Sequence, residues 1–180
     1  MKKMISMLLA LTLVFGLAAC GNNTPATDAP AQDAVKVEGT MEELVNKVME
    51  KNPVEFMGGL MPVDLTDTSE DGLFMIENYT GLSNADSVTE AAFYEPMMGS
   101  IPYSMVMVRT AEGADVAAVA GEMKNNIDQR KWVCVEADDL QVVSYGDVVM
   151  LIMVDSNNGL KSQSFVDAFA QVCGGSVTTY

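Results

Sequence analysis

The stretch LQVVSYGDVVMLIMV, residues 140–154, decides the fold of this 180-residue chain. Two runs rich in valine and other apolar residues, LQVVSY and DVVMLIMV, flank a tight turn at Tyr145-Gly146-Asp147. The second run is apolar on both faces, as is typical of a strand with neighbours on both sides. The stretch therefore predicts two strands joined by a turn, the second of them central in a sheet.

Strand and helix patterns alternate on both sides of this stretch. SVTEAAFYE (87–95) and YSMVMVR (103–109) are predicted strands, joined by the loop PMMGSIP (96–102). Apolar stripes at helical spacing predict helices in GADVAAVAGEMKNNIDQR (113–130) and SFVDAFAQVC (164–173). The segment KWVCVEA (131–137) is predicted to be a short strand or an extended link.

Two short helices are predicted before the first strand. TMEELVNKVMEK (40–51) begins with Thr40 as a cap and has Glu43 at the capping-box position. A second helix is expected over 69–79, with FMGGLMPVDL (56–65) irregular between the two. The whole pattern predicts an α+β fold: an antiparallel sheet built from two successive strand-strand-helix units, helices mainly on one face, preceded by two short helices.

The first forty residues have the pattern of an exported, lipid-anchored protein. Lys2 and Lys3 precede a short apolar run, and the LAAC end of that run (17–20) resembles the lipobox of bacterial lipoproteins. We therefore expect 1–19 to be a lipoprotein signal peptide and Cys20 to carry the lipid that anchors the protein to the outer side of the cell membrane. Residues 20–40 are predicted to be a flexible tether, because they contain few apolar side chains. Residues 41–180 have the length of a single domain.

The charge balance restricts the partners. The chain has 10 Lys and Arg against 25 Asp and Glu, and its histidine count is 0. Phosphate binding requires a basic face, so nucleic acid is not an expected partner. A cationic peptide, a cationic patch on another protein and divalent ions stay open, beside the simpler interpretation of a soluble acidic surface. The lack of histidine excludes Ser–His and Cys–His catalysis and imidazole metal sites.

The two cysteines beyond Cys20 leave two interpretations open. An extracytoplasmic pair at Cys134 and Cys173 is able to form a disulfide. Cys134 lies in a strand-like run and Cys173 ends a helix-like run, which favours two separate buried thiols.

Four segments resemble a known family. EPMMGSIPYSMVMVR (95–109), GADV (113–116), IDQRKWVCVEA (127–137) and SYGDVVMLIM (144–153) are similar to the small Gram-positive lipoproteins of the domain-of-unknown-function family numbered 4358. The Asp-x-Arg-Lys-Trp run is the most specific part, although Gln129 stands where the family pattern has proline. The resemblance implies a lipoprotein with a single domain, and it brings no catalytic residue.

Two metal-binding patterns are weighed against simpler interpretations. Methionine thioethers bind Cu(I), but Met105, Met107, Met150 and Met153 lie in strand patterns and are predicted to fill the core. DTSEDGLFMIEN (67–78) approaches a calcium loop but lacks its final Glu, and we interpret it as an acid-rich helix start. We expect no metal site and no cofactor.

Several polar residues are the candidates for chemistry. They are Glu95, Ser100, Tyr103, Arg109, Asp128, Arg130, Lys131 and Trp132. The simpler interpretation is structural, and it is specific for three of them: Arg109 pairs with Glu90 across the strands, Arg130 binds carbonyls at a helix end, and Trp132 anchors the core.

The function expected from these observations is binding without catalysis. We expect a monomeric, membrane-anchored extracytoplasmic lipoprotein that binds a protein or peptide. Its partner surface is predicted at Met97, Met98, Arg130 and Trp132, and no residue is predicted to be catalytic. The alternative is an envelope hydrolase acting on peptidoglycan or polysaccharide, with Glu95 and a second carboxylate about 5–9.5 Å away.

Overall fold

The computed structural model describes residues 35–180. The predicted signal peptide, Cys20 and most of the predicted tether lie outside these residues. The elements are, in order, α1 (Met41–Lys51), β1 (Gly58–Pro62), α2 (Glu70–Thr80), β2 (Val88–Pro96), β3 (Tyr103–Thr110), α3 (Val116–Asn126), β4 (Asp139–Tyr145), β5 (Val148–Val154), the 3-10 helix η1 (Ser156–Asn158), α4 (Ser162–Cys173) and β6 (Thr178–Thr179). The α+β class and the two successive strand-strand-helix units are confirmed.

The six strands form one antiparallel sheet in the order β1-β2-β3-β5-β4-β6. The apolar run of β5 lies between β3 and β4, so the prediction of a central strand is confirmed. The turn that joins β4 to β5 has Gly146 at φ 56°, where a residue with a side chain is strained. This hairpin supplies the central strand β5, against which β3 pairs on one side and β4 on the other.

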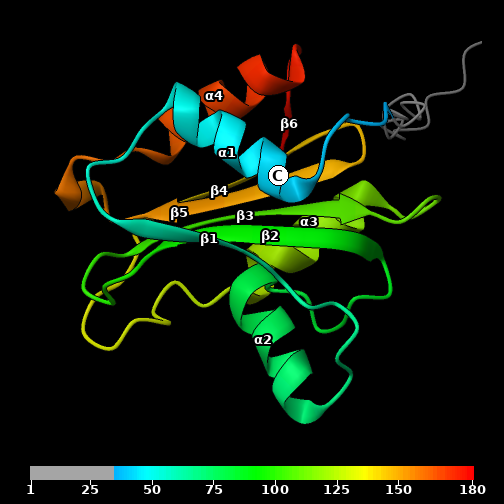
Figure 1. Ribbon diagram of the computed structural model, residues 1–180, viewed down its shortest axis with the longest axis horizontal. Helices are drawn as coiled ribbons and strands as arrows, with labels where there is room; N and C mark the ends of the chain where they lie inside the picture. The colour runs from blue at the N-terminus through cyan, green and yellow to red at the C-terminus, as the bar shows by residue number, and fades with distance from the viewer. Residues whose placement is uncertain (1–34) are drawn as a thin grey trace, which may run out of the picture. The chain divides into compact units, whose positions relative to one another are not determined.

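Helices cover both faces of the sheet, so the expectation that they lie mainly on one face is wrong. α1 and α4 pack on one face, and α2 and α3 pack on the other (Figure 1). Successive residues of β3 explain this, because Met105 and Met107 enter the first core while Val106 and Val108 enter the second. A strand that is apolar on both faces needs cover on both faces.

The helix boundaries follow the capping residues in the sequence. Thr40 caps α1 in a complete capping box with Glu43, as predicted. Ser69 caps α2, and Gly81 ends it in the left-handed conformation. Asp115 caps α3, whose buried residues Val119, Ala120 and Met123 lie on the predicted inner face.

One strand was missed by the sequence prediction, and one of two alternatives for another segment is removed. β1 lies within the segment predicted to be irregular, and it pairs with β2 although it holds two glycines and a proline. A Cβ at Gly58 would lie 2.4 Å from the Tyr94 ring, so the glycine makes room for that ring. The segment 131–137, predicted to be a short strand or an extended link, forms no strand and is a link whose Val133 is 96% exposed.

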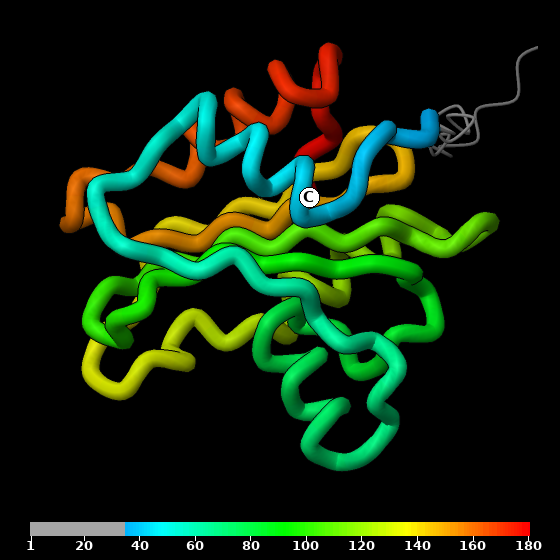
Figure 2. The backbone as a smooth tube through the Cα atoms, in the orientation of Figure 1, coloured from blue at the N-terminus to red at the C-terminus, as the bar shows by residue number. Residues whose placement is uncertain are grey.

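The end of the predicted tether is part of the folded unit. We call the contacts of Arg109, Glu90 and Asp147 with residues 35–41 the Arg109 clasp. Arg109 pairs with Asp147 at 2.6 Å and with Glu90 at 3.4 Å, the latter as predicted. It also donates to the backbone oxygens of Val37 and Gly39. Residues 35–40 therefore lie against the β4–β5 turn (Figure 2), and the folded unit begins before residue 41.

No helix within residues 35–180 is long and apolar enough to cross a lipid bilayer.

Candidate functional site

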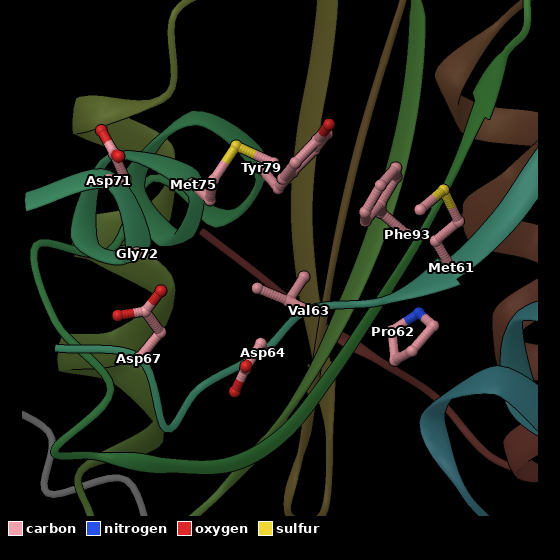
Figure 3. A pocket seen from close by; sticks show the side chains of 10 residues that line it. All are labelled: Met61, Pro62, Val63, Asp64, Asp67, Asp71, Gly72, Met75, Tyr79 and Phe93. Atoms are coloured by element: carbon pink, nitrogen blue, oxygen red, sulfur yellow. The ribbon is translucent and has the colours of Figure 1, made fainter. Parts of the chain in front are cut away.

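A cavity of about 270 Å³ lies between α2 and the edge strand β1 (Figure 3). It is on the α2 and α3 side of the sheet. The residues that line it are Met61, Pro62, Val63, Asp64, Asp67, Asp71, Gly72, Met75, Tyr79 and Phe93. They come from the end of β1, the loop that follows it, α2 and β2.

Local hydrogen bonds shape the loop wall of the cavity. Asp64 accepts from the backbone and side chain of Thr66, and Asp67 accepts from the backbone of Ser69. Asp67 lies directly over Gly72, where a Cβ would come within 2.3 Å of the Asp67 backbone oxygen. The loop is able to close against α2 because residue 72 has no side chain.

The floor and walls of the cavity are apolar. Tyr79 stacks on Phe93 with ring centroids 3.8 Å apart, which gives a flat, rigid wall. Met61 is 56% exposed and Met75 is 44% exposed, although both are large apolar side chains. Flexible thioether side chains adapt to the shape of a bound group. The cavity therefore suits an apolar group.

The rim of the cavity is negative. Asp64, Asp67 and Asp71 are exposed, and no Lys or Arg lines the cavity. The hydrogen bonds from Thr66 lower the pKa of Asp64, and those from Ser69 lower the pKa of Asp67. Both carboxylates are therefore charged at neutral pH, beside an apolar floor.

A buried polar network lies next to this cavity. The Lys131 side chain is only 5% exposed, and its Nζ pairs with Oε1 of Glu95 at 2.5 Å. The same Nζ lies 3.3 Å from Oγ of Ser104 and 5.2 Å from the centroid of the Tyr79 ring. Burial lowers the pKa of Lys131, and the charge of Glu95 opposes that shift. The network therefore contacts the cavity wall through the Tyr79 ring, over which the Lys131 ammonium group lies.

The predicted partner residues lie on two neighbouring loops. Met97 and Met98 are 73% and 62% exposed in the β2–β3 loop. Arg130 and Trp132 are in the loop 127–138, and the Glu95–Lys131 pair holds that loop to the end of β2, where the β2–β3 loop begins. The two loops lie on the same side of the molecule (Figure 2).

The individual roles of these loop residues differ in part from expectation. Arg130 pairs with Glu136 at 2.8 Å at the surface, so its predicted contact with helix carbonyls is wrong. Trp132 is half-buried against the second core, at 5.6 Å from Nζ of Lys131, so it anchors the edge of that core. Gln129 forms two hydrogen bonds with the Ala137 backbone, one through its side chain, and these hold the loop 127–138 closed.

The other candidates for chemistry do not join this site. Ser100 is exposed in the β2–β3 loop, and Asp128 accepts a hydrogen bond from the backbone of Arg130. Tyr103 is fully buried in the core under α1 and α4. Arg109 is near the opposite end of β3, in the Arg109 clasp.

Cys134 and Cys173 are free, and Cys134 is exposed, so the expected burial of Cys134 is wrong. Cys173 is partly buried, which raises the pKa of its thiol to about 12.

The strand methionines at 105, 107, 150 and 153 are fully buried, so their prediction as core residues is confirmed. The helix α2 begins at Glu70 within the calcium-like segment, and residues 35–180 contain no group of three acidic or Cys side chains able to hold a metal.

Sequence reasoning did not find the cavity itself. The apolar lining residues Met61, Met75, Tyr79 and Phe93 lie on three different elements. Their meeting depends on β1 as an edge strand, and the two glycines and one proline of β1 hide its strand character. The acidic helix start was the one visible signal, since Asp67 and Asp71 now lie on the rim.

Comparisons of this chain with models of known families, with curated proteins and with solved structures find no match.

Proposed function

We propose that this chain is a membrane-anchored extracytoplasmic lipoprotein, similar to the family numbered 4358, whose folded unit is a non-enzymatic binding module. The observation that carries the binding role is the cavity between α2 and β1, where two exposed methionines and an aromatic wall meet a carboxylate rim. The site is apolar, adaptable and marked by charge, which are features of binding sites.

The polar groups near the cavity support binding more than catalysis. Glu95 is engaged by Lys131 and by Ser104, whose hydroxyl donates to it at 2.7 Å. Ser104 is fully buried, so a substrate does not reach its hydroxyl. The carboxylates of the rim face solvent: Asp64 and Asp67 bind within local turns, and Asp71 lies in the first turn of α2. These contacts stabilise the fold and place charge at the edge of an apolar cavity.

Site-specific photo-crosslinking in intact cells tests the binding role. A photo-reactive phenylalanine analogue is placed at Met75, which lines the cavity, and separately at Phe74, which precedes it on α2 and is 64% exposed. We expect covalent adducts at position 75 in several-fold excess over position 74. Equal yields at the two positions, or no adduct at 75, would contradict the assignment of the cavity as the binding site.

A further inference from the structure

The outer edge of β1 is free to pair with another chain. The backbone N–H of Met97 donates to the Met57 oxygen, and that of Val63 donates to the Ala91 oxygen. The backbone N–H and C=O groups of the odd-numbered residues of this segment therefore point toward β2. The backbone groups of Gly58, Leu60 and Pro62 therefore point away from β2. β1 is the first strand of the sheet, and within residues 35–180 no segment pairs with this edge.

This edge has a limited set of hydrogen-bonding groups. Gly58 and Leu60 offer N–H donors, while Pro62 has only its carbonyl. Proline at one end of an edge strand limits the length of chain that is able to pair with it. A short extended peptide matches this edge better than a long strand does.

The cavity lies beside the free edge. Met61 lines the cavity from the α2 face of β1, and a Cβ at Gly59 on the same face would meet no atom within 4 Å. A strand added to β1 would lie about 4.8 Å away, with every second side chain on that face. One such side chain is then placed at the cavity between Met61 and Met75.

The charges around the cavity favour a peptide with a positive charge. Asp64, Asp67 and Asp71 form the rim, and the whole chain has a formal charge of −15. A cationic side chain two residues from the one in the cavity lies on the same face of the added strand. Its ammonium or guanidinium group is then attracted to the carboxylates of the rim.

We propose that the cavity and the free edge of β1 together bind an extended basic peptide, which adds a strand to the sheet, places a large apolar side chain in the cavity and aligns a neighbouring Lys or Arg with the rim. This inference rests on the binding role proposed above and names the class of partner. β-Strand addition supplies affinity through the backbone, while the cavity supplies the choice of side chain.

Fluorescence anisotropy with the purified full-length lipoprotein in detergent tests this proposal. The probe is a fluorescein-labelled STFTKTS heptapeptide, with STFTETS as the charge control and STATKTS as the apolar control. We expect the probe to bind at least about tenfold more tightly than either control, because one control reverses the charge and the other removes the aromatic group. The affinity should fall as salt is raised.

Two variants separate the edge from the cavity. Leu60→Pro removes an outward donor, while the matched control Leu60→Ala removes the side chain and keeps the N–H. We expect Leu60→Pro to weaken probe binding about tenfold relative to Leu60→Ala, as the loss of a backbone hydrogen bond implies. The double variant D67N/D71N should weaken binding of STFTKTS by about threefold to tenfold and leave the weak binding of STFTETS unchanged or tighter. Circular dichroism melting checks that each variant is folded.

The outcomes distinguish the two proposals. Equal binding of STFTKTS and STFTETS, or equal affinity of Leu60→Pro and Leu60→Ala, overturns the peptide assignment. If adducts form at position 75 while no peptide binds, the binding role stands and the peptide assignment fails. If the lipoprotein dimerises and Leu60→Pro abolishes the dimer, a second copy occupies the edge and the peptide assignment fails.

Discussion

Lys131 shows how one side chain joins a loop to the sheet. Its ammonium group is almost fully buried between Glu95, Ser104 and the backbone oxygen of Asn78. A buried charge is tolerated only when it is paired and hydrogen-bonded. The loop 127–138 has no strand partner, so this pair is one of the contacts that hold it in place.

Replacing Lys131 should destabilise the protein far more than replacing its neighbour Arg130. Lys131→Met keeps most of the volume but removes the only cation within residues 35–180 that pairs with the largely buried Glu95, which then keeps only the hydrogen bond from Ser104. We expect a loss of about 2–4 kcal/mol in the free energy of unfolding. Arg130→Met removes a pair whose side chains are 77% and 55% exposed, and we expect a change within about 0.5 kcal/mol. Urea unfolding measures both. Similar losses for the two variants would contradict this account of the buried pair.

Single-residue contacts were predictable where they follow from strand register. The Arg109–Glu90 pair was predictable because the two residues lie on strands that follow one another in the sequence and are joined by one loop. The contact of Arg109 with Asp147 was not, because it depends on which strand lies on the other side of β3. Lys131 was a candidate from its residue type, but nothing in its own segment indicates burial.

At the scale of elements, helices were more predictable than edge strands. The caps Thr40 and Ser69 and the closing Gly81 are local signals, because each acts on residues within one turn. β1 has no such signal, since its pairing is supplied by β2 rather than by its own propensity. The cavity is built on that strand, so the candidate site was hidden with it.

Two glycines in helices should respond to alanine in opposite directions. Gly72→Ala in α2 pushes a Cβ into the Asp67 backbone, so the loop wall of the cavity must move, and we expect a loss of about 1–2 kcal/mol. Gly121→Ala in α3 meets no atom within 4 Å, and we expect a gain of about 0.5–1 kcal/mol from helix propensity. Thermal melting with urea unfolding measures both. Stabilisation by Gly72→Ala would show that Asp67 does not lie on the helix as described.

At the scale of the whole molecule, the sequence indicates that both faces of the sheet are covered by a hydrophobic core, whereas the fold class alone does not. The α+β order of elements fits a sheet with one covered face as well as a sheet with two. The decisive signal is the unbroken apolar run of β5, in which all seven residues from Val148 to Val154 are buried. Such a run excludes a solvent-exposed face at the middle of the sheet.

Membrane attachment should depend on Cys20 and on no other cysteine. Cys20→Ser removes the expected acylation site, so we expect the protein to leave the membrane pellet or to accumulate with residues 1–19 uncleaved. Cys134→Ser and Cys173→Ser are the matched controls, and both should remain in the pellet. Cell fractionation with mass spectrometry of the N-terminal peptide measures this. A Cys20→Ser variant that stays in the pellet at its normal processed mass would contradict lipid attachment at this residue.

The Arg109 clasp also has a mechanical consequence. A tension applied to the chain ahead of Val35 reaches the bonds at Asp147 and Arg109 before it reaches α1, because those bonds hold residues 35–39. The clasp carries such a load on a few contacts between residues far apart in the sequence, whereas the strand ladders of the sheet share a load among many bonds. The clasp is therefore the first set of contacts to bear a pull from the chain ahead of Val35, before that pull reaches α1 and the sheet.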